Sequence, residues 1–466
     1  MPPENSYKLD TKSKNIKLLG EAPIRHVLWK FFLPAFTGVV VNSLYNIVDR
    51  IFVGQGVGAM ALTGLSVVFP IMIIIKAFGM LIGVGSGVRV SIFLGKKDFE
   101  SAERVLGNCF ILLIIASIAL TLMGFLIKEP LLIFFGASKE TVAYANDYLD
   151  IILAGTIFSI LGFSLNSVIR SEGNLSVAMN SMLISAGMNI VLDPIFIFGF
   201  GMGVKGAAWA TVISEFVLCV WVLRHFFRSK KSIVKLKVPN FRLDRKIIFA
   251  IFSIGFSSFA IQFASSFVHG IFNVQLIKYG GDVAVGAMGI INSVATIIVM
   301  SIVALNMAAQ PIIGYNYGAK NFTRIRQTLF ICIKAATLVA VVGTIFIQAF
   351  PSILIKTFNV SSKELLEIGR DGLRIFMLAM PIVGFQIIAG SYFQSIGKAA
   401  ISATISLLRQ VIVLIPILLI LPNYWGLTGV WASAPISDFI AAVISFVFLQ
   451  REIKKLNRAI DVQQVW

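Results

Sequence analysis

Long apolar stretches, separated by short polar segments, run along almost the whole chain. A helix needs about 20 apolar residues to cross the hydrocarbon core of a membrane. On that scale the pattern predicts membrane-spanning helices near residues 28–53, 64–87, 105–127, 142–166, 177–199, 204–226, 247–276, 284–314, 327–349, 367–392, 399–421 and 428–450. We therefore expect an all-α membrane protein with twelve transmembrane helices.

The composition supports this class. Of the 466 residues, 57% are apolar and only 13% are charged, and the mean hydropathy is +0.89, which excludes an ordinary soluble domain. The net charge of +18 would suggest nucleic acid in a soluble protein. Here the bases gather between the apolar stretches, so we expect no nucleic-acid partner. The three cysteines, Cys109, Cys219 and Cys332, lie scattered inside apolar stretches, which argues against a disulfide framework and a zinc site.

Basic residues mark one side of the membrane. The even-numbered connections between the predicted spans are rich in Lys and Arg, most of all the segment near 227–246. The odd-numbered connections carry few bases, and most of these stand beside acids, as in Lys128–Glu129 and Lys139–Glu140. By the positive-inside rule, both termini (1–27 and 451–466) are cytoplasmic segments of a multi-pass protein of the cell membrane.

The chain also repeats itself at a distance of roughly 220–228 residues. The matches are VGAM at 57–60 and 285–288, LGKKDF at 94–99 and YGAKNF at 317–322, RSEGN at 170–174 and QSIGK at 394–398, and VKGAAWATVISE at 204–215 and LTGVWASAPISD at 427–438. We therefore expect two six-helix lobes, 28–226 and 247–450, joined by a basic linker at 227–246. A pseudo-two-fold axis along the membrane normal should relate them, with a cavity between them, as in many transporters.

Polar side chains recur on one face of the first predicted span. They are Asn42, Tyr45, Asn46 and Asp49, at i, i+3, i+4 and i+7. A shift of 220 residues gives Gln262, Ser265, Ser266 and His269 in the seventh span. Such a stripe must turn away from lipid, because polar groups find no partner there.

Two acids, Asp49 and Asp193, lie inside predicted spans. A carboxylate at the bilayer centre costs roughly 2.5–3.5 kcal/mol, so such residues usually serve ions, protons or substrate. Asn189 shares a helix face with Asp193, and Ala207, Thr211 and Glu215 share a face of the next span. These oxygens suit Na⁺, or a proton shared by two carboxyl groups that cannot both ionise cheaply. Alternatively, Asn189, Thr211 and Glu215 only hold helices together by hydrogen bonds.

Three further residues inside the spans are candidates for a functional role. Pro34 in the first span is either a hinge or a proline at a helix start. Lys76 and Arg409 lie near mid-depth, too far in for their charges to reach the interface easily. Unless an acid neutralises it, Lys76 in a cavity would repel cations, and these basic residues leave an anionic or zwitterionic substrate open. The residues we expect around a substrate cavity are Tyr45, Asn46, Lys76, Gln262, His269 and Arg409.

The chain resembles the multidrug and toxic compound extrusion (MATE) family, and within it the bacterial MepA-like branch. The motifs that carry the resemblance are IVDRIFVG, GKKDF, RSEGN and NIVLDPIFIFGFGMGVKGAAWAT. The resemblance implies a cation site, able to hold Na⁺ or to exchange H⁺, made by Asp49, Asn189, Asp193, the carbonyl of Ala207, and Thr211. It also implies that the first span bends at Pro34.

Another branch of the family uses acids on spans seven and ten for its coupling cation. Here span seven offers His269 and span ten has no acid, so we expect no cation site in the second lobe. Asp438, which matches Glu215 in the repeat, is expected to have a packing role.

We therefore expect a multidrug efflux antiporter. It would export lipophilic, often cationic, small molecules in exchange for H⁺ or Na⁺ by alternating access, as a monomer in the lipid bilayer and without a cofactor. The alternative is a flippase for a lipid-linked precursor, with a cavity lined by bases such as Lys76 and Arg409. A channel stays open, because it too can line a pore with polar faces. An enzyme is not expected, because the histidines, His26, His225 and His269, lie in three different regions.

Overall fold

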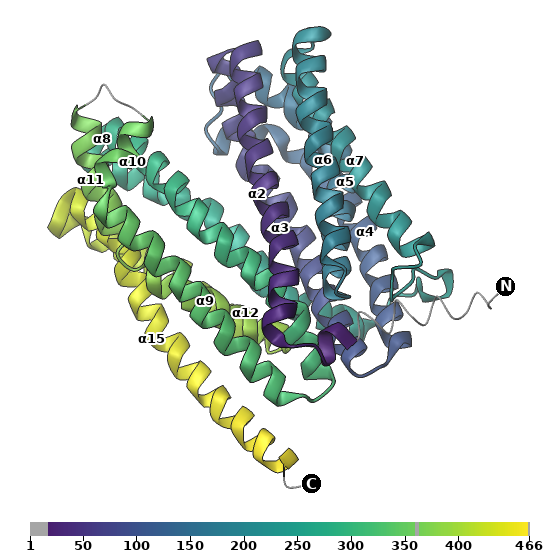
Figure 1. Ribbon diagram of the computed structural model, residues 1–466. Coiled ribbons are helices and arrows are strands. Elements are labelled where there is room, and N and C mark those ends of the chain that lie inside the picture. Colours follow the sequence, from purple (N-terminus) through teal and green to yellow (C-terminus); the bar gives the residue numbers. More distant parts are fainter. Residues whose placement is uncertain (1–16, 359–362, 465–466) are drawn as a thin grey trace. The chain divides into compact units, whose positions relative to one another are not determined.

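Helices make up almost all of the computed structural model, which describes residues 17–358 and 363–464 (Figure 1). The helices of the first half are α2 (Ile24–Gly56), α3 (Ala59–Gly95), α4 (Phe99–Phe134), α5 (Val142–Ser171), α6 (Leu175–Pro194), η1 (Ile195–Gly199), α7 (Gly203–Arg228) and η2 (Val238–Asn240). Those of the second half are α8 (Arg245–Gly318), α9 (Phe322–Ala349), α10 (Pro351–Phe358), α11 (Lys363–Phe376), α12 (Met380–Ser395), α13 (Ala399–Leu407), η3 (Leu408–Val413), α14 (Leu414–Ile420) and α15 (Pro422–Gln464).

The number of spans agrees with the sequence. Among the described residues, 11 helices are long and apolar enough to cross a membrane, or up to 12 if a bent pair counts as one span. The predicted class, an all-α membrane protein, is confirmed. Large apolar side chains such as Leu126 (82% exposed) and Phe249 (76%) lie open on the helix surfaces. Such exposure is unusual on a soluble protein and is what a lipid-facing surface requires.

The tenth predicted span, 367–392, is not one continuous helix. It consists of α11 and α12, which meet at an angle of 47° across the break that follows Phe376. Pro381 lies in the first turn of α12. A proline has no backbone N–H and its ring clashes with the carbonyl four residues before it, here that of Met377, so a straight helix cannot continue through this point.

Two spans are merged in α8, Arg245–Gly281 and Val283–Gly318. They join at Gly281, whose φ of 64° and ψ of −167° lie in a region that only glycine occupies readily. This residue lets the chain reverse with almost no loop.

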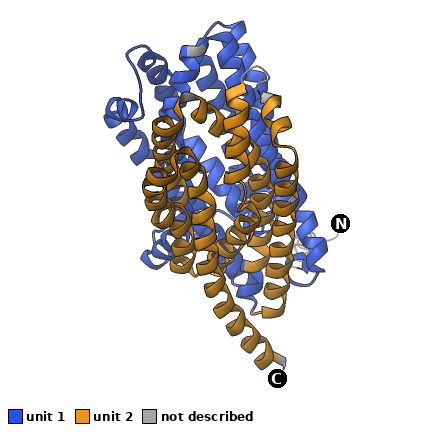
Figure 2. Cartoon of the chain, turned by 90° about the vertical axis from the view of Figure 1, so that its left-hand side faces the viewer, with its two compact units in different colours: residues 1–259, 314–319 blue, residues 260–313, 320–466 orange. Residues whose placement is uncertain are grey.

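The chain divides into two compact units (Figure 2). The N-terminal unit contains residues 1–259 and 314–319, and the C-terminal unit contains 260–313 and 320–466. In the N-terminal unit, α5 packs against α3, α4 and α7, and α6 packs against α2 and α7. In the C-terminal unit, α12 packs against α9 and α15, and α15 also contacts η3.

The sequence repeat is visible in the backbone. Lys97 and Lys320, at matching positions of LGKKDF and YGAKNF, both have positive φ (61° and 56°), although neither is glycine. Gly173 and Gly397, which match in RSEGN and QSIGK, have φ values of 82° and 78°. The two halves therefore make the same turns at the same places.

The helices that follow these lysines start in the same way. Asp98 caps α4 by accepting a hydrogen bond from the backbone N–H of Ser101, and Asn321 caps α9 by accepting one from Arg324. The N–H of Ser101 stabilises the ionised carboxylate and lowers the pKa of Asp98.

Candidate cation site and ligand cavity

Asp49 and Asp193 come from two helices that pack side by side. Asp49 lies on α2, and Asp193 lies in the last turn of α6. Asp193 is fully buried and Asp49 is 9% exposed. Their carboxyl groups lie next to each other, close enough to interact directly.

Asn189 connects the acids to a third helix. It lies one turn before Asp193, as the i, i+4 spacing on α6 requires. Its Nδ2 donates weak hydrogen bonds to Oδ1 of Asp193 at 3.4 Å and to Oγ1 of Thr211 on α7 at 3.5 Å. The structure thus brings together four of the five residues expected at the cation site. The fifth, Ala207, is buried one turn before Thr211 on the same helix.

Three acceptor oxygens of this cluster have no hydrogen-bond partner among the described residues. They are Oδ1 of Asp49, Oδ1 of Asn189 and Oδ2 of Asp193, and all three are buried. Buried polar atoms are nearly always satisfied in folded proteins, so three such oxygens at one place call for an explanation. A bound Na⁺ could satisfy all three, and a proton shared by the two carboxyl groups would satisfy the oxygens of Asp49 and Asp193.

Sequence reasoning did not include Tyr148 in this site. Tyr148 belongs to α5 and is 4% exposed, and its hydroxyl lies near the Thr211 side chain and near Asp49. Its position in an apolar span gives no hint of this, because helix periodicity shows which residues share a face but not which helix that face meets.

Glu215 has its hydrogen-bond partner outside the cluster of Asp49, Asn189, Asp193 and Thr211. It shares a face of α7 with Thr211, but its Oε1 accepts a hydrogen bond from Oγ of Ser159 on α5 at 2.9 Å. The ammonium group of Lys76, on α3, interacts electrostatically with Glu215 and with Tyr45. An acid therefore does accompany Lys76, and the lysine charge is partly balanced inside the N-terminal unit.

Pro34 and Asn46 are two further positions of the first span that the sequence singled out. Pro34 lies well inside α2, not at its start, so the reading as a helix-start proline is wrong and the hinge remains a prediction. For Asn46, only the helical backbone is described and its side chain lies outside the described residues.

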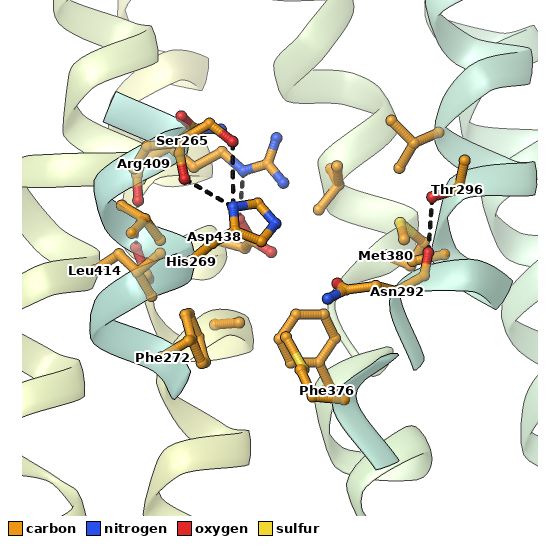
Figure 3. A pocket seen from close by; sticks show the side chains of 18 of the residues that line it. Ser265, His269, Phe272, Asn292, Thr296, Phe376, Met380, Arg409, Leu414 and Asp438 are labelled. Atoms are coloured by element: carbon orange, nitrogen blue, oxygen red, sulfur yellow. Dashed lines mark hydrogen bonds and ion pairs between the residues drawn. The ribbon is translucent and has the colours of Figure 1, made fainter. Parts of the chain in front are cut away.

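A cavity of about 280 Å³ lies within the C-terminal unit (Figure 3). Residues of α8, α11, α12, η3, α14 and α15 line it, including His269 and Arg409. Gln262, two turns before His269 on α8, is not among its lining residues. The seventh-span stripe is therefore divided, with Ser265 and His269 at this cavity and Gln262 outside it.

Asp438 does more than pack. Its Oδ1 accepts a hydrogen bond from Nε of Arg409 at 2.7 Å, within the cavity wall. Arg409 lies on the π-helical segment η3, and the hydroxyl of Ser437 donates to the Arg409 carbonyl at 2.8 Å. The expectation that Asp438 has a packing role alone is thus corrected, because the repeat predicted its position but not its partner on the preceding span.

Comparison with known proteins decides the family. The MatE family model matches residues 34–195 and 257–420, one segment in each half of the chain and most of its length. The chain belongs to the MatE family. The two matched segments each begin in the first span of a sequence repeat, so the repeat and the family assignment support each other.

Relatives and solved structures align with this chain over almost its whole length. The multidrug export protein MepA of Staphylococcus aureus strain MSSA476 is 28% identical over 450 residues, which are 95% of this chain and 97% of the relative. An outward-facing multidrug resistance MATE family transporter of the MOP superfamily has a TM-score of 0.89 and 26% identity, over 96% of this chain and 99% of that structure. A MATE crystal structure in the bent conformation has a TM-score of 0.89 and 27% identity, over 96% and 98%.

Proposed function

We propose that this MatE protein is a multidrug efflux antiporter that exports lipophilic, often cationic, small molecules in exchange for H⁺ or Na⁺. The observation that carries the exchange step is the cluster of three buried oxygens, of Asp49, Asn189 and Asp193, that have no hydrogen-bond partner in the described part of the chain. The multidrug export function of the MepA relatives supports the choice of cargo.

The coupling follows from the charges of the cluster. Two adjacent carboxyl groups away from water attract a cation strongly, and the site can hold a proton, a sodium ion or, nearby, a cationic drug. A coupling ion that enters Asp49 and Asp193 from outside neutralises them and weakens the hold on a drug. One elementary charge moving down 100 mV releases about 2.3 kcal/mol, enough for a roughly 50-fold gradient of cargo.

The direction of transport depends on orientation in the membrane. The distribution of Lys and Arg favours both termini on the cytoplasmic side of the cell membrane, so the linker near 227–246 is cytoplasmic. The protein works by alternating access, as a monomer and without a cofactor.

Pro34 is the proposed hinge. It removes one backbone hydrogen bond inside α2, the helix that carries Asp49. A similar MATE structure has been solved in a bent conformation, which supports bending as part of the cycle. Bending of α2 would move Asp49 relative to Asp193 and change the affinity of the site.

The test uses purified protein in liposomes with an imposed pH or sodium gradient, and fluorescence of ethidium as the cargo signal. Asp49→Asn and Asp193→Asn should each abolish gradient-driven efflux, since an amide can neither release a proton nor balance a cation. Asp371→Asn is the matched control, because Asp371 is 61% exposed and pairs only with the adjacent Arg370 among the described residues.

The control should transport at the rate of the unaltered protein, and all three variants should insert into the membrane in equal amounts. Undiminished, gradient-driven efflux by both Asp49→Asn and Asp193→Asn would refute the coupling site.

A further inference from the structure

Both polar and apolar side chains line the cavity of the C-terminal unit (Figure 3). Arg409, Asp438 and His269 form one side of it, here called the polar wall, and Asn292 and Thr296 add polar groups on the other side (Figure 3). Phe272 and Phe376 form an edge-to-face pair, with ring centroids 6.1 Å apart, at the apolar end. Its volume of about 280 Å³ lies just under the roughly 300–1,000 Å³ of sites for small organic molecules, in which a few placed polar groups orient an apolar ligand.

Arg409 offers unused hydrogen-bond donors to this cavity. Asp438 engages only its Nε atom, at 2.7 Å. The terminal Nη atoms point away from Asp438 and into the cavity (Figure 3), and within the described parts of the chain no hydrogen bond or ion pair is formed by them. The fixed fork of a guanidinium matches a carboxylate, which accepts two parallel hydrogen bonds from it.

His269 lines the same cavity as Arg409, and one of its two ring nitrogens already has a hydrogen-bond partner. Its Nδ1 lies 2.7 Å from the backbone carbonyl oxygen of Ser265. A carbonyl can only accept, so Nδ1 carries the hydrogen. Nε2 is then left to accept a hydrogen bond from a ligand while the ring is neutral, or to donate one when the ring is protonated.

The charges of the polar wall select among ligands. Arg409 and Asp438 together carry no net charge, so the wall does not favour an anion without a compensating positive group. A zwitterion suits it, with its carboxylate on the Nη atoms of Arg409 and its positive group near Asp438. The aromatic pair suits a flat apolar body, and the adaptable thioethers of Met288 and Met380 also line the cavity.

We propose that this cavity is a second ligand site, distinct from the Asp49–Asp193 cluster, which binds zwitterionic aromatic compounds through their carboxylate. Arg409 holds the carboxylate, and Phe272 and Phe376 contact the rings. As a route for export this site rests on the proposed efflux function, but ligand binding at it does not depend on ion coupling.

The experiment compares two dyes that differ only at the carboxyl group, a zwitterionic rhodamine with a free carboxylate and its methyl ester. Their affinities for the full-length protein in detergent are measured by fluorescence polarisation, with no ion gradient. Arg409→Lys keeps the charge that Asp438 needs but loses the fork. It should weaken binding of the free acid about tenfold and that of the ester less than about twofold.

Asp438→Asn tests the same site, and it should change the ratio of the two affinities in the opposite direction. It leaves the Arg409 charge uncompensated, so the free acid should bind more tightly relative to the ester. Arg458→Lys, at an exposed position near the end of α15, is the matched control and should change neither affinity. Because binding is measured without a gradient, a failure of the Asp49–Asp193 coupling scheme would leave these results unchanged.

Two outcomes would overturn the proposal. One is an equal loss of affinity for both dyes in Arg409→Lys, which would mean that the Arg409–Asp438 ion pair is purely structural. The other is an unchanged ratio of the two affinities in both variants, which would mean that the carboxylate does not meet this wall. Thermal unfolding of each variant identifies a protein that has failed to fold, and the remaining variant then decides.

Discussion

Glu172 accepts a hydrogen bond from Nε2 of His225 at 2.5 Å, with both side chains buried. Glu172 follows α5, in the RSEGN segment, and His225 lies in the last turn of α7. The other carboxylate oxygen accepts from the backbone N–H groups of Ile233 at 2.8 Å and Val234 at 3.2 Å. One acid thus ties two helix ends and the start of the predicted linker together.

Removing this acid should destabilise the N-terminal unit. Glu172→Ala leaves the His225 ring and two backbone N–H groups without their acceptor, and each unsatisfied buried donor costs about 1–3 kcal/mol. We expect the free energy of unfolding to fall by about 3 kcal/mol, seen as a lower unfolding temperature in detergent. Glu172→Gln should cost less, because its carbonyl oxygen still accepts.

The matched control is Glu100→Ala. Glu100 is exposed and pairs only with Arg104 among the described residues, so its loss should cost less than about 1 kcal/mol. Equal melting of the Glu172→Ala and Glu100→Ala proteins would show that the buried acid does not stabilise this region.

Much of this fold could be predicted from the sequence, because a lipid-facing helix must be apolar over a fixed length. The spans and the internal repeat follow from that rule and from matching motifs such as LGKKDF and YGAKNF. The bend between α11 and α12 was missed, since Pro381 inside an apolar stretch is compatible with either a kink or a helix start.

The site could be predicted in part. Acids inside apolar spans and the helix-face spacing singled out Asp49, Asp193, Asn189 and Thr211, and the family resemblance joined them with the carbonyl of Ala207 into one cation site. Spacing could not show that Glu215 turns to Ser159, that Tyr148 joins the cluster, or that Arg409 meets Asp438. Each of these depends on which neighbouring helix a face meets, and a single helix does not encode its partner.

The proposed hinge predicts opposite effects on stability and transport. Pro34→Ala restores an N–H inside α2 and removes a ring clash, so the helix should straighten and the protein should become more stable, by up to about 3 kcal/mol. Efflux should slow if bending is part of the cycle. The measurements are the unfolding temperature in detergent and the initial rate of ethidium efflux from liposomes.

Pro70→Ala provides the matched control for this variant. Pro70 lies inside α3 and carries no proposed hinge role, so its replacement should raise stability without slowing efflux. Equal efflux rates for Pro34→Ala and the unaltered protein would remove the hinge from the scheme.

Topology can be tested with single cysteines, because the native cysteines are all buried. Glu140 and Lys230 are exposed residues of connections predicted to lie on opposite sides of the membrane. A membrane-impermeant maleimide added to intact cells should label Glu140→Cys and not Lys230→Cys, and both should react after the cells are opened. Labelling of Lys230→Cys in intact cells would reverse the predicted orientation.

Thr211 distinguishes Na⁺ from H⁺ as the coupling ion. Its hydroxyl could bind Na⁺ as an oxygen ligand, but it does not exchange protons near neutral pH. Thr211→Val keeps the shape and removes the oxygen, so sodium-driven efflux should fall about tenfold while proton-driven efflux stays within about twofold of normal. Thr211→Ser keeps the hydroxyl and should behave like the unaltered protein under both gradients.

The rates are compared in liposomes with a sodium gradient alone and with a pH gradient alone. Loss of proton-driven efflux in Thr211→Val, with full activity in Thr211→Ser, would contradict this division of roles, because it would make the hydroxyl part of the proton path through Asp49 and Asp193.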